Sequence, residues 1–204
     1  ILVFLTGLSL ILYPSISNYI NSQNQSRAIA NYAEDVAGLS REEYEQLLEQ
    51  AKSYNVRLSA MGSNWKLSQE ELDQYNEILN VNKNGMMGYI EIPKIQCSLP
   101  IYHSTDEAVL QKNVGHLPGS SLPVGGESTH SVLSGHRGLP SAKLFSDLDK
   151  VETGDKFVIR VLNETLTYEV DQILIVLPNE MDTLNIEEGK DLCTLVTCTP
   201  YGVN

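Results

Sequence analysis

The chain has 204 residues and a formal net charge of -12, which argues against a nucleic-acid-binding protein because such proteins carry a basic face. Hydrophobic residues make up 42% of it and charged residues 20%, a balance that supports one folded domain with appended segments and excludes a disordered chain. The three cysteines exclude a dense disulfide scaffold, and because no CxxC pair is present we expect no structural zinc site.

Residues 1–13 form an uncharged apolar run, ILVFLTGLSLILY. The run is shorter than the roughly 20 residues that span a bilayer, and we interpret it as the remnant of an N-terminal transmembrane anchor. The alternative is the apolar region of a cleaved signal peptide, but no small-x-small cleavage site follows it clearly. In either case we expect the rest of the chain to lie outside the cell.

Residues 14–86 are expected to form a helical juxtamembrane segment. Its first part, residues 14–38, is polar and rich in Asn, Gln and Ser, which is typical of a helix or stalk beside a membrane. Ser40 with Glu43 then forms a capping box, which predicts a helix over residues 40–55.

A second capping box, Ser68 with Glu71, predicts another helix further along the chain. Between the two predicted helices we expect a loop over residues 57–67, RLSAMGSNWKL. This loop contains Trp65, the only tryptophan of the chain.

Residues 87–204 show the alternation of apolar and polar residues that is typical of half-buried strands. Turn signals such as ETGD separate the candidate strands, and short helices are expected at 105–112 and 140–148. The candidate strands are YIEIPKI, SLPIYH, HSVLSGH, KFVIRVL, TLTYEVDQILIV and LCTLVTC. The pattern predicts a mainly β fold, a closed or nearly closed β-barrel with short helical insertions.

Cys198 lies at the end of the apolar run TLVTC, and Pro200 and Gly202 then favour a turn. A lone cysteine on a strand is most often a small buried residue, which is how we interpret Cys97 and Cys193. A cysteine at a strand end is different, because a nucleophile needs a fixed backbone and one open side. A free thiol with a pKa of about 8.5 also needs a base or a cation nearby.

His136 is the candidate partner for such a thiol. It follows the strand HSVL within SGHRG, and the small residues around it leave space for a substrate backbone. By itself it would be interpreted as an ordinary turn residue. The remaining histidines, His103, His116 and His130, are interpreted as packing residues, since their spacing is not that of zinc ligands.

Three stretches together resemble the sortase family. They are residues 88–126, residues 128–150 (STHSVLSGHRGLPSAKLFSDLDK) and residues 194–204 (TLVTCTPYGVN). The TLVTC and SGHRG motifs are specific in combination, although either one alone is weak. The helical segment before the barrel and the TPYG after the cysteine indicate class C, the pilus-assembling branch.

The resemblance implies an eight-stranded barrel that is anchored in the cell membrane, on the extracellular face of a Gram-positive bacterium. It implies a cysteine transpeptidase, without a cofactor, that cleaves LPXTG-like sorting signals of pilin or surface proteins. Cys198 matches the nucleophile that forms the acyl-thioester. His136 matches the group that protonates the leaving amine and deprotonates the incoming one, which would be a pilin lysine or a cell-wall peptide.

The site arginine of the family lies on the strand after the cysteine, so we expect it past Asn204. Neither Arg137 nor Arg160 matches it. The resemblance therefore implies that this chain is a fragment that ends before the last strand of the barrel and is inert as it stands.

Class C sortases often close the groove with a lid that contains an Asp-Pro-aromatic sequence. In this chain Ser63, Asn64 and Trp65 stand where that sequence should fall. We expect residues 57–67 to fold over the groove near Cys198, held more weakly than usual because the aspartate is missing. The alternative is that Trp65 packs against the helices.

Two other functions stay open from the sequence. A non-enzymatic surface module that binds peptides would keep the barrel, but it would have no reason to place Cys198 and His136 at strand ends. A hydrolytic cysteine protease would use the same two residues, because the sequence does not show whether water or an amine is the acceptor.

Overall fold

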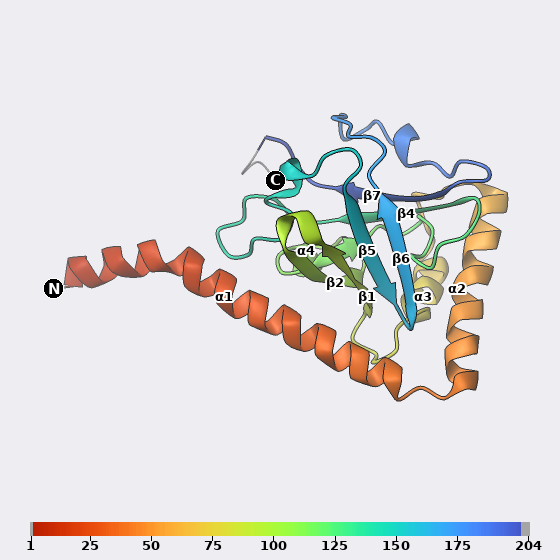
Figure 1. The fold of residues 1–204 in the computed structure, drawn as a ribbon, viewed down its shortest axis with the longest axis horizontal. Helices are drawn as coiled ribbons and strands as arrows, with labels where there is room; N and C mark the ends of the chain where they lie inside the picture. The colour runs from red at the N-terminus through yellow and green to blue at the C-terminus, as the bar shows by residue number, and fades with distance from the viewer. Residues whose placement is uncertain (1, 201–204) are drawn as a thin grey trace.

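The structure of the protein is a computed structural model that describes residues 2–200 (Figure 1). Three helices precede the strands, and a fourth, short helix lies among them: α1 (Leu2–Ala37), α2 (Arg41–Met61), α3 (Gln69–Glu77) and α4 (Glu107–Leu110). The strands are β1 (Met86–Ile92), β2 (Cys97–His103), β3 (Val114–His116), β4 (Thr129–Ser134), β5 (Lys156–Val161), β6 (Glu164–Glu169) and β7 (Asp191–Val196). Short 3-10 turns occur at η1 (Pro93–Ile95), η2 (Leu148–Lys150) and η3 (Asp182–Leu184).

The strands form one seven-stranded sheet in the order β6-β5-β1-β2-β3-β4-β7. The pairs β2–β3 and β4–β7 are parallel, and the other neighbours are antiparallel. The sheet curls around a core that includes Ile90, Ile101, Leu133 and Ile159, all fully buried. The expected mainly β fold, a nearly closed barrel with short helical insertions, is confirmed.

The short helix expected at 140–148 is wrong. This segment is a series of turns, and only the 3-10 turn η2 follows it. Leu144 has a φ of 39°, which lies outside the right-handed helical region and interrupts any helix there. The Leu144 side chain is only 4% exposed, so this backbone conformation coincides with burial of the side chain in the core.

The strand predicted over TLTYEVDQILIV, residues 165–176, is shorter in the structure. Strand β6 ends at Glu169, which pairs with Lys156 at the start of β5, so the partner strand ends at the same level. Residues 173–177 continue as an apolar segment without regular secondary structure, and their side chains are exposed. In residues 2–200 no strand pairs with this segment, and alternation alone could not show where the ladder stops.

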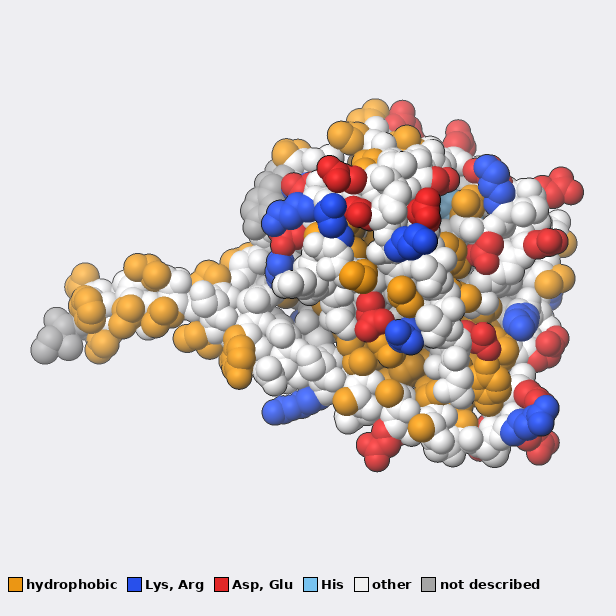
Figure 2. All heavy atoms as spheres, viewed as in Figure 1, with side chains coloured by type: hydrophobic (Ala, Val, Ile, Leu, Met, Phe, Trp, Pro, Cys, Tyr) orange, Lys and Arg blue, Asp and Glu red, His pale blue; other side chains and the backbone are white. Residues whose placement is uncertain are grey.

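Helix α1 is unbroken from Leu2 to Ala37, so the expected anchor and the polar stretch after it are one helix. Its first half carries exposed apolar side chains and projects away from the barrel (Figure 1, Figure 2). By length and composition this helix could cross a membrane. Its second half is docked on the barrel: the Tyr32 hydroxyl donates to the Met87 carbonyl at 2.8 Å and accepts from the Leu162 N–H at 2.8 Å.

Helix α2 begins at the predicted capping box, in which Ser40 and Glu43 bond each other's backbone N–H groups. The helix runs on to Met61, so the loop expected over 57–67 begins only at Gly62. The longer helix packs through tertiary contacts that the local sequence does not show, since Leu58, beyond the predicted end, is buried. Buried Asn55 donates to the Leu122 carbonyl at 2.9 Å and accepts from the Leu122 N–H at 2.7 Å, which holds this part of α2 against the barrel.

Buried histidines fasten the helical segment to the sheet. In His116 the Nε2 donates to the Ser121 carbonyl at 2.8 Å, so Nδ1 is free to accept from the Tyr75 hydroxyl, also at 2.8 Å. Tyr75 lies on α3 and is itself fully buried. His103 and His130 are buried as well, with backbone carbonyls as partners. The interpretation of these three histidines as packing residues agrees with their placement.

We expect His116 to govern part of the loss of stability in acid. Burial lowers the pKa of His116 from 6.5 to about 3, whereas in the unfolded chain the pKa returns to its ordinary value. As the pH falls below about 6.5, the unfolded state binds the proton first, so the free energy of unfolding should decrease. The contribution of His116 to the slope of the unfolding free energy against pH should approach about 1.4 kcal/mol per pH unit, and urea unfolding over that pH range measures it.

In His116→Gln this contribution to the acid slope should disappear. The matched control is Tyr75→Phe, which removes the hydroxyl but leaves the histidine buried. That variant should be less stable at neutral pH and should keep the slope. Equal slopes in the wild type and in His116→Gln would show that the histidine does not control acid unfolding.

Candidate active site

The parallel pairing of β4 with β7 brings the two candidate catalytic residues to one end of the sheet. The ladder is in register, and its last pair is Ser134 with Val196. The same step along each chain leads to His136 and Cys198. Parallel strands end at the same edge of a sheet, so both residues leave the ladder there.

Two further hydrogen bonds continue this pairing past the ends of the strands. The Gly135 N–H donates to the Val196 carbonyl at 3.1 Å. The Thr197 hydroxyl donates to the Gly135 carbonyl at 2.8 Å. The backbones just before His136 and Cys198 are therefore tied to each other directly.

The alternation of side chains along β7 separates its two cysteines. Cys193 and Leu195 pack against the hydrophobic core, so residues of the other parity point away from it. Cys198 has that other parity and is exposed. All three cysteines are free thiols, including Cys97, so no disulfide joins Cys97 and Cys193. The expected turn after Cys198 includes Tyr201 and Gly202, which lie outside the described residues.

His136 is mostly enclosed and has an acidic neighbour on α4. Its side chain is 14% exposed, and its Nε2 lies 3.5 Å from the Oε2 of Glu107, a contact that becomes an ion pair when the imidazole is protonated. The pKa of Glu107 is lowered first by a hydrogen bond from Gln111 and then by His136. Sequence reasoning missed Glu107, because no local pattern links α4 to a histidine that follows β4.

The backbone before His136 leaves no room for a larger residue. A Cβ on Gly135 would lie 2.7 Å from the Phe145 ring, which is fully buried. The Phe145 N–H also donates to the His136 carbonyl at 3.1 Å. The loop after His136 therefore folds back and packs against the residue that precedes the histidine.

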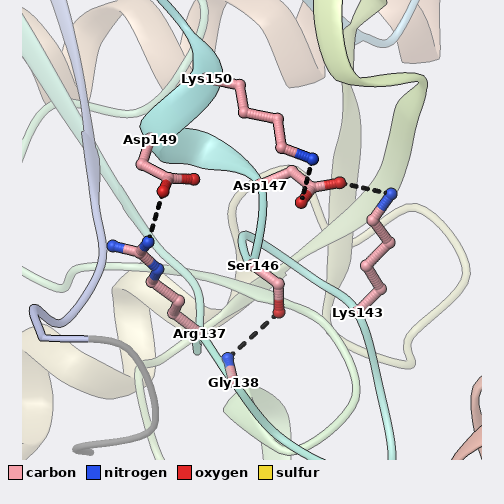
Figure 3. Close-up of polar contacts among 7 residues, drawn as sticks. All are labelled: Arg137, Gly138, Lys143, Ser146, Asp147, Asp149 and Lys150. Atoms are coloured by element: carbon pink, nitrogen blue, oxygen red, sulfur yellow. Dashed lines mark hydrogen bonds and ion pairs between the residues drawn. The ribbon is translucent and has the colours of Figure 1, made fainter.

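Polar contacts brace the rest of this loop (Figure 3). The Gly138 N–H donates to the Ser146 hydroxyl at 3.1 Å, and the Arg137 guanidinium reaches Asp149 in η2 at 2.7 Å. Lys143 and Lys150 both pair with Asp147, at 2.6 and 2.8 Å. Arg137 thus braces the loop, which fits the expectation that it is not the substrate-binding arginine of the site.

Trp65 is half-buried in the loop between α2 and α3. This loop rests on Gly119, where the Asn64 N–H approaches the Gly119 carbonyl at 3.4 Å and a Cβ on the glycine would lie 1.9 Å from the Asn64 carbonyl oxygen. The contact places the loop against the segment after β3. That Trp65 lies near Cys198 stays a prediction.

In residues 2–200 there is no group of three or more His, Cys, Asp or Glu side chains that could hold a metal ion. The chemistry that the site offers is that of a thiol and an imidazole. An exposed thiol can attack a carbonyl carbon, and an imidazole can carry the proton that the leaving group requires.

The sequence profile of the sortase domain matches residues 90–204. The chain belongs to the sortase family. Sortase C1 from Streptococcus agalactiae superposes on it with a TM-score of 0.85 at 53% identity, covering 87% of this chain and 92% of that one. Sortase C from Streptococcus pneumoniae superposes with a TM-score of 0.74 at 41% identity, covering 87% and 90%. The resemblance to class C sortases is thereby confirmed.

Two other relatives extend the comparison. A lid mutant of sortase A from Corynebacterium diphtheriae superposes with a TM-score of 0.74 at 43% identity, covering 81% of this chain and 89% of that one. Sortase D from Bacillus subtilis is 34% identical over 114 residues, which are 56% of this chain and 54% of that protein. The chain spans about half the length of the curated relatives it matches.

We expect a thiol reagent to label Cys198 of this sortase well before the other two cysteines. Burial raises the pKa of Cys97 to about 12 and raises that of Cys193 further, so both stay protonated near neutral pH. Mass spectrometry after brief alkylation of the native protein measures the order. Unfolding in urea is the control, since all three thiols should then react alike. Faster labelling of Cys193 than of Cys198 in the native state would overturn the assignment of faces.

Proposed function

We propose that the protein is a cysteine transpeptidase, with Cys198 as nucleophile and His136 as acid–base partner. The observation that carries this proposal is the parallel register of β4 and β7, which brings the two residues to one end of the sheet. Family membership supports it, because the two motifs occur within the matched domain.

The proposed reaction has two halves. The Cys198 thiol passes its proton to His136 as its sulfur forms a bond to a peptide carbonyl carbon. The peptide C–N bond then breaks, and His136 gives that proton to the leaving amine. An incoming amine then loses a proton to His136 and forms a new amide bond as the C–S bond breaks, and His136 returns the proton to the Cys198 sulfur. The thioester splits one difficult acyl transfer into two easier steps, and it conserves the energy of the peptide bond.

The proposed substrates are pilin or surface proteins that carry LPXTG-like sorting signals, and the proposed acceptor is a pilin lysine or a cell-wall peptide. The support is the likeness to sortases C, among them the Streptococcus pneumoniae enzyme whose pilin substrate specificity has been studied structurally. The projecting apolar half of α1 supports anchoring in a membrane, and membership of the sortase family supports the extracellular face of a Gram-positive cell.

Substitution of Cys198 by alanine should abolish acyl transfer in the full-length protein. His136→Ala should reduce kcat/KM by about 10²–10⁴, the usual contribution of a general acid–base residue. A sorting-signal peptide with and without an added amine measures both, and Cys97→Ala is the matched control that should keep activity. A fully active Cys198→Ala protein would indicate a non-enzymatic module, and release of acid alone at every amine concentration would indicate a hydrolase.

We also propose that the loop around Trp65 limits access to Cys198. The observation behind it is that Trp65 is half-buried in a loop that touches Gly119 through a long backbone hydrogen bond from Asn64. Trp65→Ala should then increase the alkylation rate of Cys198 several-fold, while the exposed neighbour Lys66→Ala should leave it unchanged. If Trp65→Ala lowers stability without changing this rate, the tryptophan only packs against its surroundings.

A further inference from the structure

Helix α1 joins the apolar projection to the barrel without a break. Side chains such as Val3 (86% exposed) and Ile11 (76% exposed) show that the first half packs against nothing within the described chain. A helix that is apolar on all sides and exposed is suited to a lipid environment. Within about one turn after Ile16, the helix begins to contact the barrel through polar side chains.

The first of these contacts are made by two asparagines, and both reach the loop that follows His136. The Asn18 Oδ1 accepts from the Lys143 N–H at 2.8 Å. The Asn21 Nδ2 donates to the Ser141 carbonyl at 2.8 Å. The pair therefore uses opposite polarities, an acceptor on Asn18 and a donor on Asn21, to hold one short piece of backbone.

This piece of backbone is connected to the histidine within a few residues. Phe145 follows Lys143 closely, donates its N–H to the His136 carbonyl at 3.1 Å, and places its ring where a Cβ on Gly135 would be. A shift of the backbone at Ser141 and Lys143 would thus move Phe145, whose ring packs on Gly135 and whose N–H bonds the His136 carbonyl. Close packing transmits such a shift rather than absorbing it.

A third contact of α1 reaches the segment just after α4. The Gln25 Nε2 donates to the Lys112 carbonyl at 2.5 Å. Lys112 follows Gln111, which bonds the carboxylate of Glu107, and Glu107 in turn approaches His136. One face of α1 therefore holds both the loop after His136 and the segment that carries its acidic neighbour.

We propose that Asn18 and Asn21 are positioning residues, through which the helix that leaves the apolar projection fixes the loop of His136. The proposal rests on the acid–base role proposed for His136. The same contacts set the orientation of the barrel relative to the membrane, because the loop held by α1 lies on the side from which the apolar half of the helix projects (Figure 1). The end of the sheet with Cys198 and His136 would accordingly lie toward the membrane.

The opposite polarities allow a test with one substitution at three positions. Aspartate at position 18 keeps the acceptor for the Lys143 N–H, so Asn18→Asp should behave like the wild type. Asn21→Asp removes the donor and sets a carboxylate against the Ser141 carbonyl, so it should release the loop. Asn24 is exposed, and Asn24→Asp is the matched control for added charge on α1. Asn18→Leu removes the acceptor and should resemble Asn21→Asp.

Two measurements on the full-length protein in lipid nanodiscs decide the outcome. In Asn21→Asp and Asn18→Leu, amide exchange at Lys143 and Phe145 should become at least about tenfold faster, and kcat should fall roughly 10- to 100-fold with little change in KM. Asn18→Asp and Asn24→Asp should change neither quantity. Equal behaviour of the three aspartate variants, or faster exchange with unchanged kcat, would overturn the proposal. An inactive wild type would instead contradict the proposed function, because in the wild type the contacts of α1 are all intact.

Discussion

The parallel pairing of β4 with β7 is the constraint on which the site depends. An antiparallel pair would send the two chains in opposite directions, and residues that follow each strand would leave from opposite ends of the ladder. In the parallel arrangement the residues after Ser134 and Val196 leave together. The hydrogen bonds of Gly135 and Thr197 keep the two backbones joined for one more step, so His136 and Cys198 start from a shared, fixed base. A site built on strand ends is more rigid than one built on free loops.

The helices before the barrel are held by buried side chains that each make two hydrogen bonds. Tyr32 on α1 bonds the backbone of Met87 and of Leu162, and Asn55 on α2 bonds both backbone groups of Leu122. A buried donor or acceptor without its partner costs about 1–3 kcal/mol, so displacing either helix would leave several such groups unsatisfied. The helical segment is for this reason an integral layer of the domain, and α1 can act on the loop after His136 because Tyr32 fixes its other end.

The sequence allowed accurate prediction where local chemistry decides the structure. The capping boxes at Ser40 and Ser68 form as expected, and alternation located every strand of the described residues except the three-residue β3. Prediction failed where distant packing acts. In α2, Leu58 lies beyond the predicted end of the helix and is buried. The turns of 140–148 are held by contacts such as Gly138 with Ser146 instead of helical bonds. The motifs around Cys198 and His136 were recognisable because the strand, the small residues and the turn are adjacent in sequence. Glu107 and the α1 asparagines were not, because only the fold brings them to that loop.

The three free thiols show how one residue type is divided into inert and available groups by backbone geometry alone. Cys193 and Cys198 lie near each other in sequence, but Cys193 packs against the core from within β7, whereas Cys198 has the opposite parity, follows the end of β7 at Val196 and is exposed. Burial and, to a smaller extent, the charge of Asp191 raise the pKa of Cys193, which keeps this thiol protonated. An extra residue between the two would place both on one face and bury the exposed thiol or expose the buried one. The spacing along β7 therefore matters as much as the motif itself: it selects one cysteine for the solvent-facing side, at the end of the ladder that His136 shares.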